Sequence, residues 1–175
     1  MILPGRTVLL QKIVRTILST AIQTQPCGID LTLKRILTFT SPGSIDLTNT
    51  NRKIAETTVI RFKPPPSPSD DSDPSEDSVD LPLGSYLVEF NETVDVPLNL
   101  MGQIFVRSSL WRSGALVQAG VLDSGYRGVV GGLLQVVNPE GLRLYRDARI
   151  AQVVFSQMTG VTEGYKGVYQ GSQGL

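Results

Sequence analysis

The N-terminal residues carry apolar side chains at the spacing of a helix. Apolar positions return every three or four residues and would form one stripe along a helix. Lys12 and Arg15 interrupt the run, and no small-residue cleavage site follows it. The pattern predicts one N-terminal helix and neither a signal peptide nor a membrane span. The apolar positions are Val8, Leu9, Leu10, Ile13, Val14, Ile17, Leu18, Ala21 and Ile22.

After this run the pattern changes to alternation. Branched and aromatic residues occupy alternate positions in residues 29–33 and 36–40, and strand character resumes at 57–62 after a Pro42-Gly43 turn. From residue 84 to residue 155, short apolar runs recur about every 8 to 12 residues between turn-forming residues, which is typical of an all-β sandwich or barrel. The prediction is a mainly β protein with helix confined to its N-terminal end.

Two segments lack a regular spacing of apolar residues. Residues 64–82 are rich in proline and acidic residues, and such a composition buries too little apolar surface to order itself, so a surface insertion is predicted. Residues 160–175 are rich in Gly, Gln, Ser and Tyr. This composition predicts either a flexible C-terminal lid that folds over a ligand or a disordered terminus. Residues 1–175 together are expected to form a single domain.

Charge and rare residue types exclude several classes of protein. Sixteen basic residues balance sixteen acidic ones, so the chain has no general attraction to nucleic acid or membrane. The absence of histidine excludes a Ser-His-Asp relay, an HExxH zinc site and a His-ligated haem. The single cysteine, Cys27, excludes an internal disulfide and a Cys-rich zinc site, and predicts a reducing, cytoplasmic location.

The segment 107–112 (RSSLWR) joins two guanidinium groups and two hydroxyls directly after an apolar stretch. Arginine forks bind phosphate oxygens bidentately, so Arg107 and Arg112 are suited to an oligophosphate. The alternative is a helix start capped by Ser108 or Ser109, with both arginines exposed.

The segment 120–128 (GVLDSGYRG) sets Asp123 beside a tight turn and Tyr126 three residues later. A carboxylate can orient or deprotonate a water, and a tyrosine ring can close over a sugar and exclude an extra hydroxyl. The alternative is a plain hairpin turn, because Asp, Ser and Gly all favour turns. Gln152, in the apolar run 149–155, is either a ligand contact or a solvent-facing strand residue.

Five segments, in this order, resemble the deoxyuridine triphosphatase and deoxycytidine triphosphate deaminase superfamily: residues 27–31 (CGIDL), 107–110 (RSSL), 120–128, 149–152 (RIAQ) and the Gly-rich tail. The resemblance implies a distorted β-barrel, dUTPase-like and of the β-clip type, with a short N-terminal helix. It also implies a homotrimer whose active sites are drawn from neighbouring subunits. Mg²⁺ is expected to bind through substrate phosphates and waters, with no protein metal ligand, as its reluctance to dehydrate favours. No nucleic acid polymer and no membrane is expected as a partner.

The resemblance assigns roles to individual residues of this chain. Asp123 matches the catalytic carboxylate that positions water or the sugar 3′-hydroxyl, and Tyr126 matches the ring that packs against deoxyribose. The residues matching the triphosphate contacts are Arg107, Ser108, Ser109 and Gln152. The expected substrate-binding residues are, in full, Arg107, Ser108, Ser109, Arg112, Tyr126, Gln135, Gln152, Tyr165, Lys166, Tyr169 and Gln173.

The strand after the turn separates two activities. Deaminase members of the family place a glutamate there, ahead of an asparagine, as a proton shuttle. Anchoring on Asn138 puts Gln135 at that position and makes Gly131-Gly132 a two-residue insertion, whereas without a gap the position is Leu133. Neither residue exchanges protons as a carboxylate does. The prediction is therefore a dUTP diphosphatase that converts deoxyuridine triphosphate to dUMP and pyrophosphate. The alternatives are a dCTP deaminase, a bifunctional dCTP deaminase/dUTPase, and a non-catalytic nucleotide-binding regulator.

Overall fold

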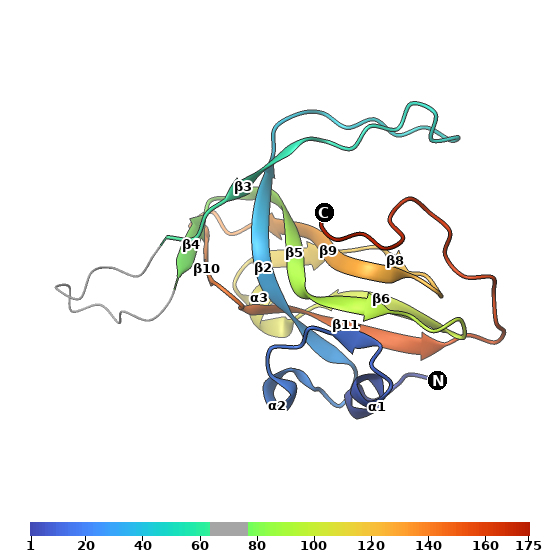
Figure 1. Cartoon of the computed structure of the whole chain (residues 1–175). Coiled ribbons are helices and arrows are strands. Elements are labelled where there is room, and N and C mark those ends of the chain that lie inside the picture. The colour runs from blue at the N-terminus through green and yellow to red at the C-terminus, as the bar shows by residue number, and fades with distance from the viewer. Residues whose placement is uncertain (64–76) are drawn as a thin grey trace.

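Antiparallel strands dominate the computed structural model of the chain, which describes residues 1–63 and 77–175 (Figure 1). Within those residues, nine strands form one curled sheet in the order β7-β9-β5-β2-β11-β6-β8, with β1 added on β5 and β3 added on β2, and two further strands pair as β10-β4. The strands are β1 Val14–Arg15, β2 Ile29–Phe39, β3 Thr57–Ile60, β4 Ser78–Leu81, β5 Gly84–Asp95, β6 Leu100–Val106, β7 Ala115–Gln118, β8 Val121–Leu122, β9 Arg127–Val136, β10 Leu142–Tyr145 and β11 Arg149–Gln157.

The strand β2 runs through the centre of the sheet. It pairs with β11 at its start, where Asp30 lies opposite Gln152, and with β5 and β3 further along. The sequence predicts two strands, 29–33 and 36–40, in this region; the structure has one strand, with an irregularity between Leu33 and Arg35 that bends it. The mainly β character predicted from the alternation is confirmed.

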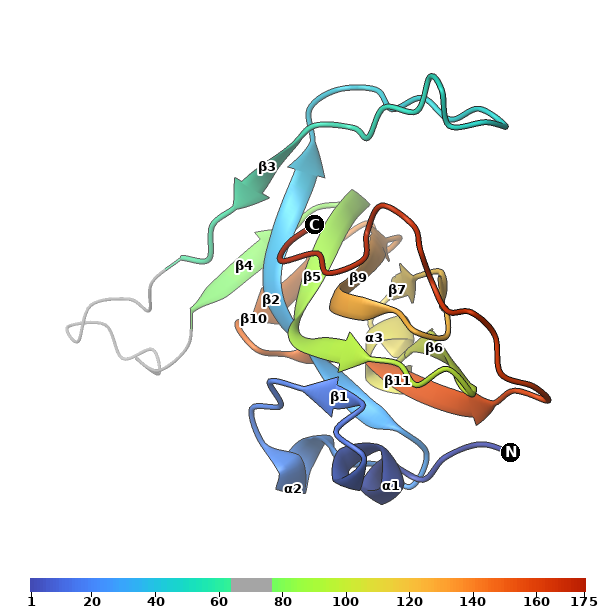
Figure 2. The same ribbon diagram turned by 45° about the vertical axis from the view of Figure 1, so that its right-hand side comes forward.

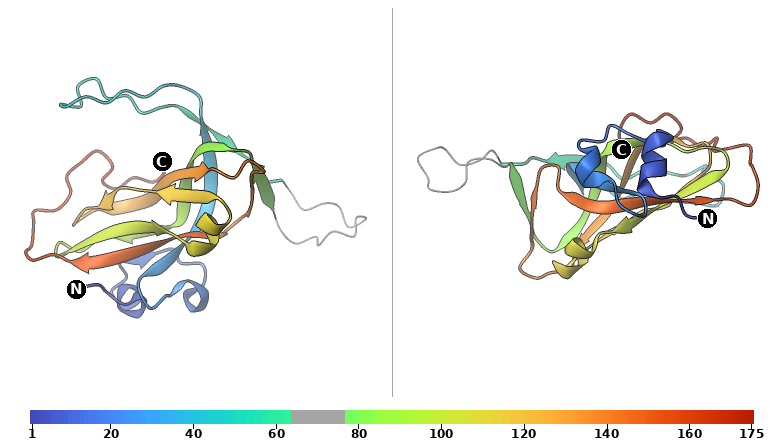
Figure 3. Two further views of the ribbon diagram at one scale, coloured as in Figure 1. Left: turned by 180° about the vertical axis from the view of Figure 1, so that it is seen from behind. Right: turned by 90° about the horizontal axis from the view of Figure 1, so that it is seen from below.

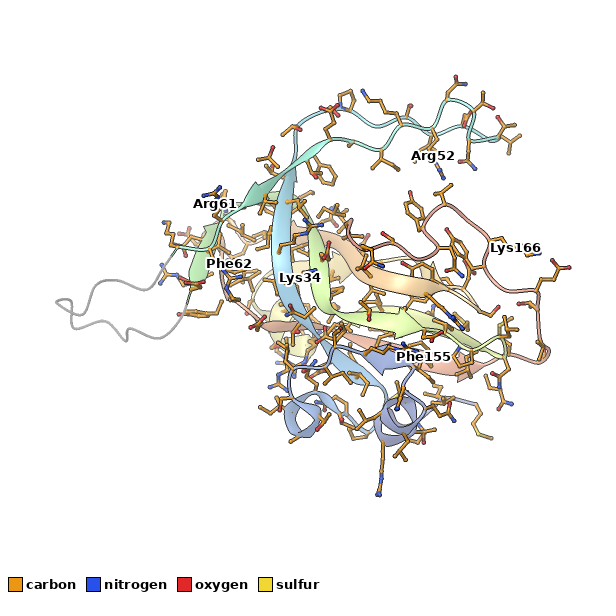
Figure 4. All side chains as sticks on the ribbon, viewed as in Figure 1. Lys34, Arg52, Arg61, Phe62, Phe155 and Lys166 are labelled. Atoms are coloured by element: carbon orange, nitrogen blue, oxygen red, sulfur yellow. The ribbon has the colours of Figure 1, made fainter. Side chains whose placement is uncertain are left out.

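The core lies inside the curl of the sheet. Residues on the inner faces of β2, β5 and β11 are fully buried, among them Leu31, Phe90 and Phe155, the last of which is labelled in Figure 4. Burying side chains of this size stabilises the fold by about 1.5 to 3 kcal/mol each. The sheet is thereby held rigid enough to position the loops at its edges.

The single N-terminal helix predicted over residues 8–22 is wrong. The segment forms a short helix α1 (Gly5–Leu10), then β1, then a second short helix α2 (Thr20–Gln23). Lys12 and Thr16 adopt positive φ angles of 55° and 56°, which no α-helix contains. Between them the chain pairs with β5, with Val14 opposite Val94. Pairing with a strand that lies far along the chain overrides the local helical spacing. All the helices of the described residues are too short to cross a membrane.

Two further predictions need correction. Helix is not confined to the N-terminal end, because α3 (Ser108–Arg112) follows β6. Its N-cap is Arg107 and has no side-chain capping bond, so neither serine caps it as the alternative proposed. The insertion predicted at 64–82 ends earlier, since β4 pairs with β10 and buries Val79 and Leu81. Residues 64–76 lie outside the described residues.

Two irregular segments lie over the same part of the sheet. The arm, residues 40–56 between β2 and β3, projects from the body as an extended hairpin closed by the Ser44–Lys53 pair. The tail, residues 160–175 after β11, returns across the open side of the sheet beneath the arm, as Figures 1 and 2 both show. Figure 3 shows α1 and α2 at a different end of the sheet from the arm.

Candidate active site

Asp123 lies at the turn between β8 and β9. The turn is held by hydrogen bonds from the Gly125 N–H to the Val96 carbonyl at 2.9 Å and from the Tyr126 N–H to the Asp123 carbonyl at 3.1 Å. Gly125 has a φ of +78°, and a Cβ there would lie 2.9 Å from the Cα of Gly164. Only glycine fits this close approach to the tail. The hairpin interpretation of residues 120–128 is therefore correct as a description of the backbone, and it presents Asp123 at the surface.

The turn opens into a cavity of about 470 Å³, here called the Asp123 cavity. Its volume is within the usual range for small-molecule sites. Four separate parts of the chain enclose it. They are β5, with Leu87; the hairpin and β9, with Asp123, Tyr126 and Gly131; the arm, with Ile54; and the tail, with Tyr165, Tyr169 and Leu175.

Tyr126 forms a rigid wall of this cavity. Its hydroxyl donates a hydrogen bond of 2.6 Å to the carbonyl of Val129, and its ring meets that of Tyr165 edge to face at 5.5 Å. Burial, and then the neighbouring Tyr165, raise the pKa of Tyr126 above its ordinary value. The phenol therefore stays neutral and offers an apolar ring face to whatever occupies the cavity.

Two of the expected phosphate-binding residues, Arg107 and Gln152, lie in a second group together with Arg149 and Asp30, here called the arginine cluster. The carboxylate of Asp30 lies 3.3 Å from Nε of Arg107 and 3.1 Å from Nη1 of Arg149. Arg107 also donates to the Arg149 carbonyl at 3.2 Å, and the Gln152 amide donates to the Cys27 carbonyl. The pairing of β11 with both β6 and β2 brings these residues together.

Asp30 and Arg149 are members of this cluster that the sequence analysis gave no role. The Asp30 side chain is fully buried. Burial raises the pKa of Asp30, against the opposing charges of Arg107 and then Arg149. Within the part of the chain that the structure describes, its Oδ1 atom has no hydrogen-bond partner. A buried carboxylate between two arginines fixes both guanidinium groups at the end of β6.

Ser108, Ser109 and Arg112 lie beside this cluster on α3. Both serines and Arg112 are exposed, and the Arg112 guanidinium stacks over the Trp111 ring at 4.7 Å. The short helix thus presents two hydroxyls and a cation to solvent next to Arg107. Such a surface is suited to an anion, because hydroxyls and guanidinium groups donate to phosphate oxygens.

The arginine cluster and the Asp123 cavity lie at opposite ends of β6. Leu122, next to Asp123, pairs with Gly102 near the start of β6, whereas Arg107 directly follows its end. Five residues of extended chain separate Gly102 from Arg107, which is about 16 Å. One copy of the chain therefore does not bring Asp123 and Arg107 into the same cavity.

The tail residues divide into two sets. Tyr165 and Tyr169, two of the residues expected to bind substrate, line the Asp123 cavity. Lys166, labelled in Figure 4, instead lies on the outer side of the tail and pairs with Glu163 at 2.7 Å. Gln173 donates to the Gly171 carbonyl at 3.2 Å.

Two contacts of the tail involve residues that the sequence analysis missed. The Gln170 amide accepts from the Arg127 N–H and donates to the Gly125 carbonyl, both at 2.9 Å. The Arg52 guanidinium of the arm lies 5.8 Å from the centre of the Tyr169 ring, a cation–π distance, and Figure 4 shows Arg52 above the tail. The sequence marks neither residue, because both act through partners far along the chain.

Gln135 lies away from the Asp123 cavity. It sits in β9 opposite Ser85 of β5 and Leu116 of β7, four residues and about 13 Å beyond Gly131, which lines the cavity. The β5–β9 register shifts between Glu89 and Thr93, so the extra residues at this point are on β5, while β9 stays regular.

The side chains available as metal ligands limit how a metal ion can bind. Within the described residues, no group of three or more His, Cys, Asp or Glu side chains is placed to hold a metal ion. Among the described residues, Asp123 supplies the acidic side chain that lines the Asp123 cavity. This set fits an ion such as Mg²⁺ bound mostly through ligand phosphates and waters, and it does not form a protein cage.

Comparison with known proteins gives consistent matches. Residues 6–158 match the family model described as dCTP deaminase-like. The chain is 41% identical over 149 residues to the probable deoxyuridine 5′-triphosphate nucleotidohydrolase of Methanosarcina acetivorans, covering 85% of this chain and 81% of that one. It is 35% identical over 149 residues to the deoxyuridine 5′-triphosphate nucleotidohydrolase of Methanocaldococcus jannaschii, covering 85% and 88%.

A solved structure shares the fold. The 2′-deoxycytidine 5′-triphosphate deaminase of Agrobacterium tumefaciens matches with a TM-score of 0.58 and 17% identity over 88% of this chain. The match spans 48%, about half, of that longer chain. At this identity the likeness concerns the fold of the curled sheet and carries no argument about activity.

Proposed function

The chain belongs to the dCTP deaminase-like family, and within that family we propose that it is a dUTP diphosphatase that hydrolyses dUTP to dUMP and pyrophosphate. The observation that carries the proposal is that Asp123 and Tyr126, three residues apart on one turn, line a single cavity of nucleoside size. The relatives named as deoxyuridine triphosphate nucleotidohydrolases support the choice of substrate.

Asp123 acts on the attacking water. Its carboxylate accepts a hydrogen bond from the water and orients the water oxygen toward the α-phosphorus. The new bond forms between that oxygen and the α-phosphorus, and the bond from the α-phosphorus to the bridging oxygen breaks. The bridging oxygen leaves with pyrophosphate, and the proton lost by the water passes by way of Asp123 to solvent.

Tyr126 acts on the sugar. Its ring is held by the hydrogen bond to Val129 and by the edge of Tyr165, so it cannot rotate away to admit a larger group. Packed against the 2′ position of deoxyribose, the ring leaves no space for a 2′-hydroxyl. Selection of deoxyribonucleotides over ribonucleotides follows from this packing.

The triphosphate contacts come from a neighbouring subunit of a homotrimer. Gly102, which pairs with the residue before Asp123, lies about 16 Å along β6 from Arg107, so a nucleotide bound at one copy's Asp123 is completed by the arginine cluster and α3 of another. In this arrangement Arg107, Ser108, Ser109, Arg112 and Gln152 hold the phosphate oxygens. Stabilisation of the charge that develops on the phosphates is the main catalytic effect expected of such groups.

Mg²⁺ fits the site as an ion carried by the nucleotide. Asp123 would hold it through water, and the phosphate oxygens would supply its other ligands. The bound ion would neutralise part of the triphosphate charge. Orientation of water, packing of the sugar and binding of the phosphates remain the work of the residues above.

The rival activity, deamination of dCTP, lacks its proton shuttle. Neither Leu133 nor Gln135 is a carboxylate. The acid closest to Gly131 across the sheet is Glu89. Burial opposes its charged form, but hydrogen bonds from Lys34, the Leu175 amide and Arg35 together keep the pKa of Glu89 below its ordinary value. A carboxylate held ionised in this way is a poor proton donor to a leaving amine.

The proposal is tested by incubating the protein with dUTP and Mg²⁺ and separating the products. We expect dUMP and pyrophosphate in equal amounts, and slower turnover of UTP because of Tyr126. Tight binding of dUTP without turnover would instead identify a nucleotide-binding regulator.

A further inference from the structure

We propose that Glu89 is a positioning residue of the nucleotide site: together with Arg35 it holds Leu175, whose side chain closes one end of the Asp123 cavity. This inference rests on the proposed function only in naming the occupant of the cavity. The contacts themselves do not depend on it.

Two main-chain atoms of Leu175 are bound. Its N–H donates to Oε2 of Glu89 at 3.0 Å, and its main-chain oxygen accepts from Nη2 of Arg35 at 3.3 Å. Hydrogen bonds to ionised groups are about twice as strong as neutral ones. Glu89 and Arg35 thus hold Leu175, one residue of the irregular tail, in place through hydrogen bonds.

Glu89 is itself fixed in place. Its side chain is fully buried, and it accepts hydrogen bonds from Lys34 at 2.7 Å and from Nε and Nη2 of Arg35 at 2.9 and 2.6 Å. Lys34 and Arg35 both come from the irregular point where β2 bends. Two successive cations at this bend hold the carboxylate ionised and pointed at the tail.

Gly131 provides the space for the Leu175 side chain. It pairs with Glu89 across the sheet, and a Cβ at this position would lie 2.2 Å from Cδ1 of Leu175 and 2.4 Å from the carbonyl oxygen of Val88. The missing side chain at Gly131 therefore forms a notch that the leucine fills. Both Gly131 and Leu175 line the Asp123 cavity, so the notch is part of its wall.

The consequence is a tail held at both ends. At its start, the Tyr165 N–H donates to the Ser124 carbonyl at 2.7 Å, and at its end Leu175 is held by Glu89. Tyr165 itself and Tyr169, which lies between these points, are the two tail rings that line the cavity. The cavity keeps about 470 Å³ with the tail in place, so Leu175 walls the site without filling it. Fixing the tail in advance reduces the entropy that a ligand must remove on binding.

The rate of trypsin cleavage after Lys166 measures how firmly the tail is held, because Lys166 is exposed and lies between the two held points of the tail. Cleavage there releases residues 167–175 and is followed by mass spectrometry. We expect Leu175→Gly and Glu89→Gln to accelerate cleavage about 5- to 10-fold. Val168→Ala is the matched control, since Val168 is an exposed tail residue outside the cavity wall, and its cleavage rate should match the unmodified protein.

Kinetics supply the second readout. Loss of a cavity wall removes binding shared by substrate and transition state, so KM for dUTP should rise about 5-fold in Leu175→Gly while kcat changes little. A residue that only supported the fold would lower the melting temperature and leave KM unchanged.

The outcomes separate the two proposals. Cleavage of Glu89→Gln at the unmodified rate overturns the role of Glu89, and cleavage of Leu175→Gly at the unmodified rate overturns the role of the Leu175 side chain, whether or not dUTP is hydrolysed. Faster cleavage with no hydrolysis of dUTP by the unmodified protein supports the hold on the tail and overturns the proposed function. If Glu89→Gln folds poorly, Arg35→Gln decides the question, because Arg35 is partly exposed and contacts both Glu89 and the main-chain oxygen of Leu175.

Discussion

The side-chain oxygen of Gln170 accepts a hydrogen bond of 2.9 Å from the main-chain N–H of Arg127. Arg127 directly follows Tyr126 in the hairpin, and the same Gln170 amide donates to the carbonyl of Gly125, which precedes it. One tail residue therefore clamps the turn that carries Asp123 and Tyr126. The tail and the turn are parts of one structural unit.

Gln170→Ala should loosen this unit. Two hydrogen bonds are lost, each worth about 0.5 to 1.5 kcal/mol, so we expect KM for dUTP to rise about 5- to 10-fold. Gln157→Ala, which removes an exposed glutamine at the end of β11, is the control and should leave KM unchanged. An unchanged KM in Gln170→Ala would show that the turn keeps its geometry without the tail.

Asp123→Asn should abolish turnover and preserve the fold. The amide keeps the shape of the side chain but loses the charge that orients water, and we expect kcat to fall about 100-fold or more. Asp123 is exposed, so the melting temperature should stay within a degree or two of the unmodified value. Glu140→Gln, which neutralises an exposed carboxylate at another turn, is the matched control. A folded Asp123→Asn protein with normal kcat would move water activation to another residue.

Arg107 and Arg112, both proposed to bind the triphosphate, should respond differently to substitution by alanine. Arg107→Ala leaves the buried Asp30 with fewer partners, and we expect a loss of about 1 to 3 kcal/mol of unfolding free energy together with weaker dUTP binding. Arg112→Ala removes an exposed guanidinium, so only binding should weaken. Calorimetry with dUTP and deoxyuridine checks this result, because loss of a phosphate contact affects the nucleotide alone. Equal losses for both ligands in Arg112→Ala would assign that arginine to the fold.

The sequence predicts most of the sheet and little of what surrounds it. Buried and more exposed residues alternate along β6 and most of β11, because successive side chains of a strand point to opposite faces, and one face of each strand lies in the core. The segment around Val14 was assigned to a helix because its apolar spacing is helical. Its state is decided by Val94, which lies in β5 some 80 residues later. A local pattern carries no information about such a partner.

The same limit applies to the site. Asp123 and Tyr126 stand out in the sequence because turn formers surround them. Asp30, Gln170 and Arg52 do not, since a lone acid, an amide in a polar tail and a cation in a loop are common on protein surfaces. Their roles arise from contacts with β11, the hairpin and the tail, and these contacts exist only once the sheet has closed.

Buried Glu92 should give the stability a defined pH dependence. Burial raises the pKa of Glu92 above its ordinary value, against hydrogen bonds from Thr32 and Gln23. The folded state therefore holds this proton more tightly than the unfolded chain does. The resulting stabilisation is complete below the unfolded pKa and is lost as the pH rises through the folded pKa.

Urea unfolding of the unmodified protein and of Glu92→Gln isolates this effect. The unfolding free energy of the unmodified protein, minus that of the variant, should decrease as the pH rises from about 4, near the pKa of a glutamate in the unfolded chain. All other titrating groups are shared by the two proteins, so their contributions cancel. A difference that is independent of pH would mean that Glu92 has the same proton affinity in the folded and unfolded states.

The separation of Gln135 from the Asp123 cavity gives the sharpest test between the two activities of the family. The unmodified protein should release no uracil nucleotide from dCTP, because an amide cannot take a proton from water and return it to the leaving amine. Gln135→Glu should also fail to deaminate dCTP, since a carboxylate at this position lies about 13 Å along β9 from Gly131. Leu133→Glu places the carboxylate nearer, opposite Leu87, which lines the cavity. The nucleotide products are separated by chromatography. Conversion of dCTP to a uracil nucleotide by the unmodified protein would overturn its assignment as a diphosphatase alone. A residue other than Gln135 would then have to act as the proton shuttle.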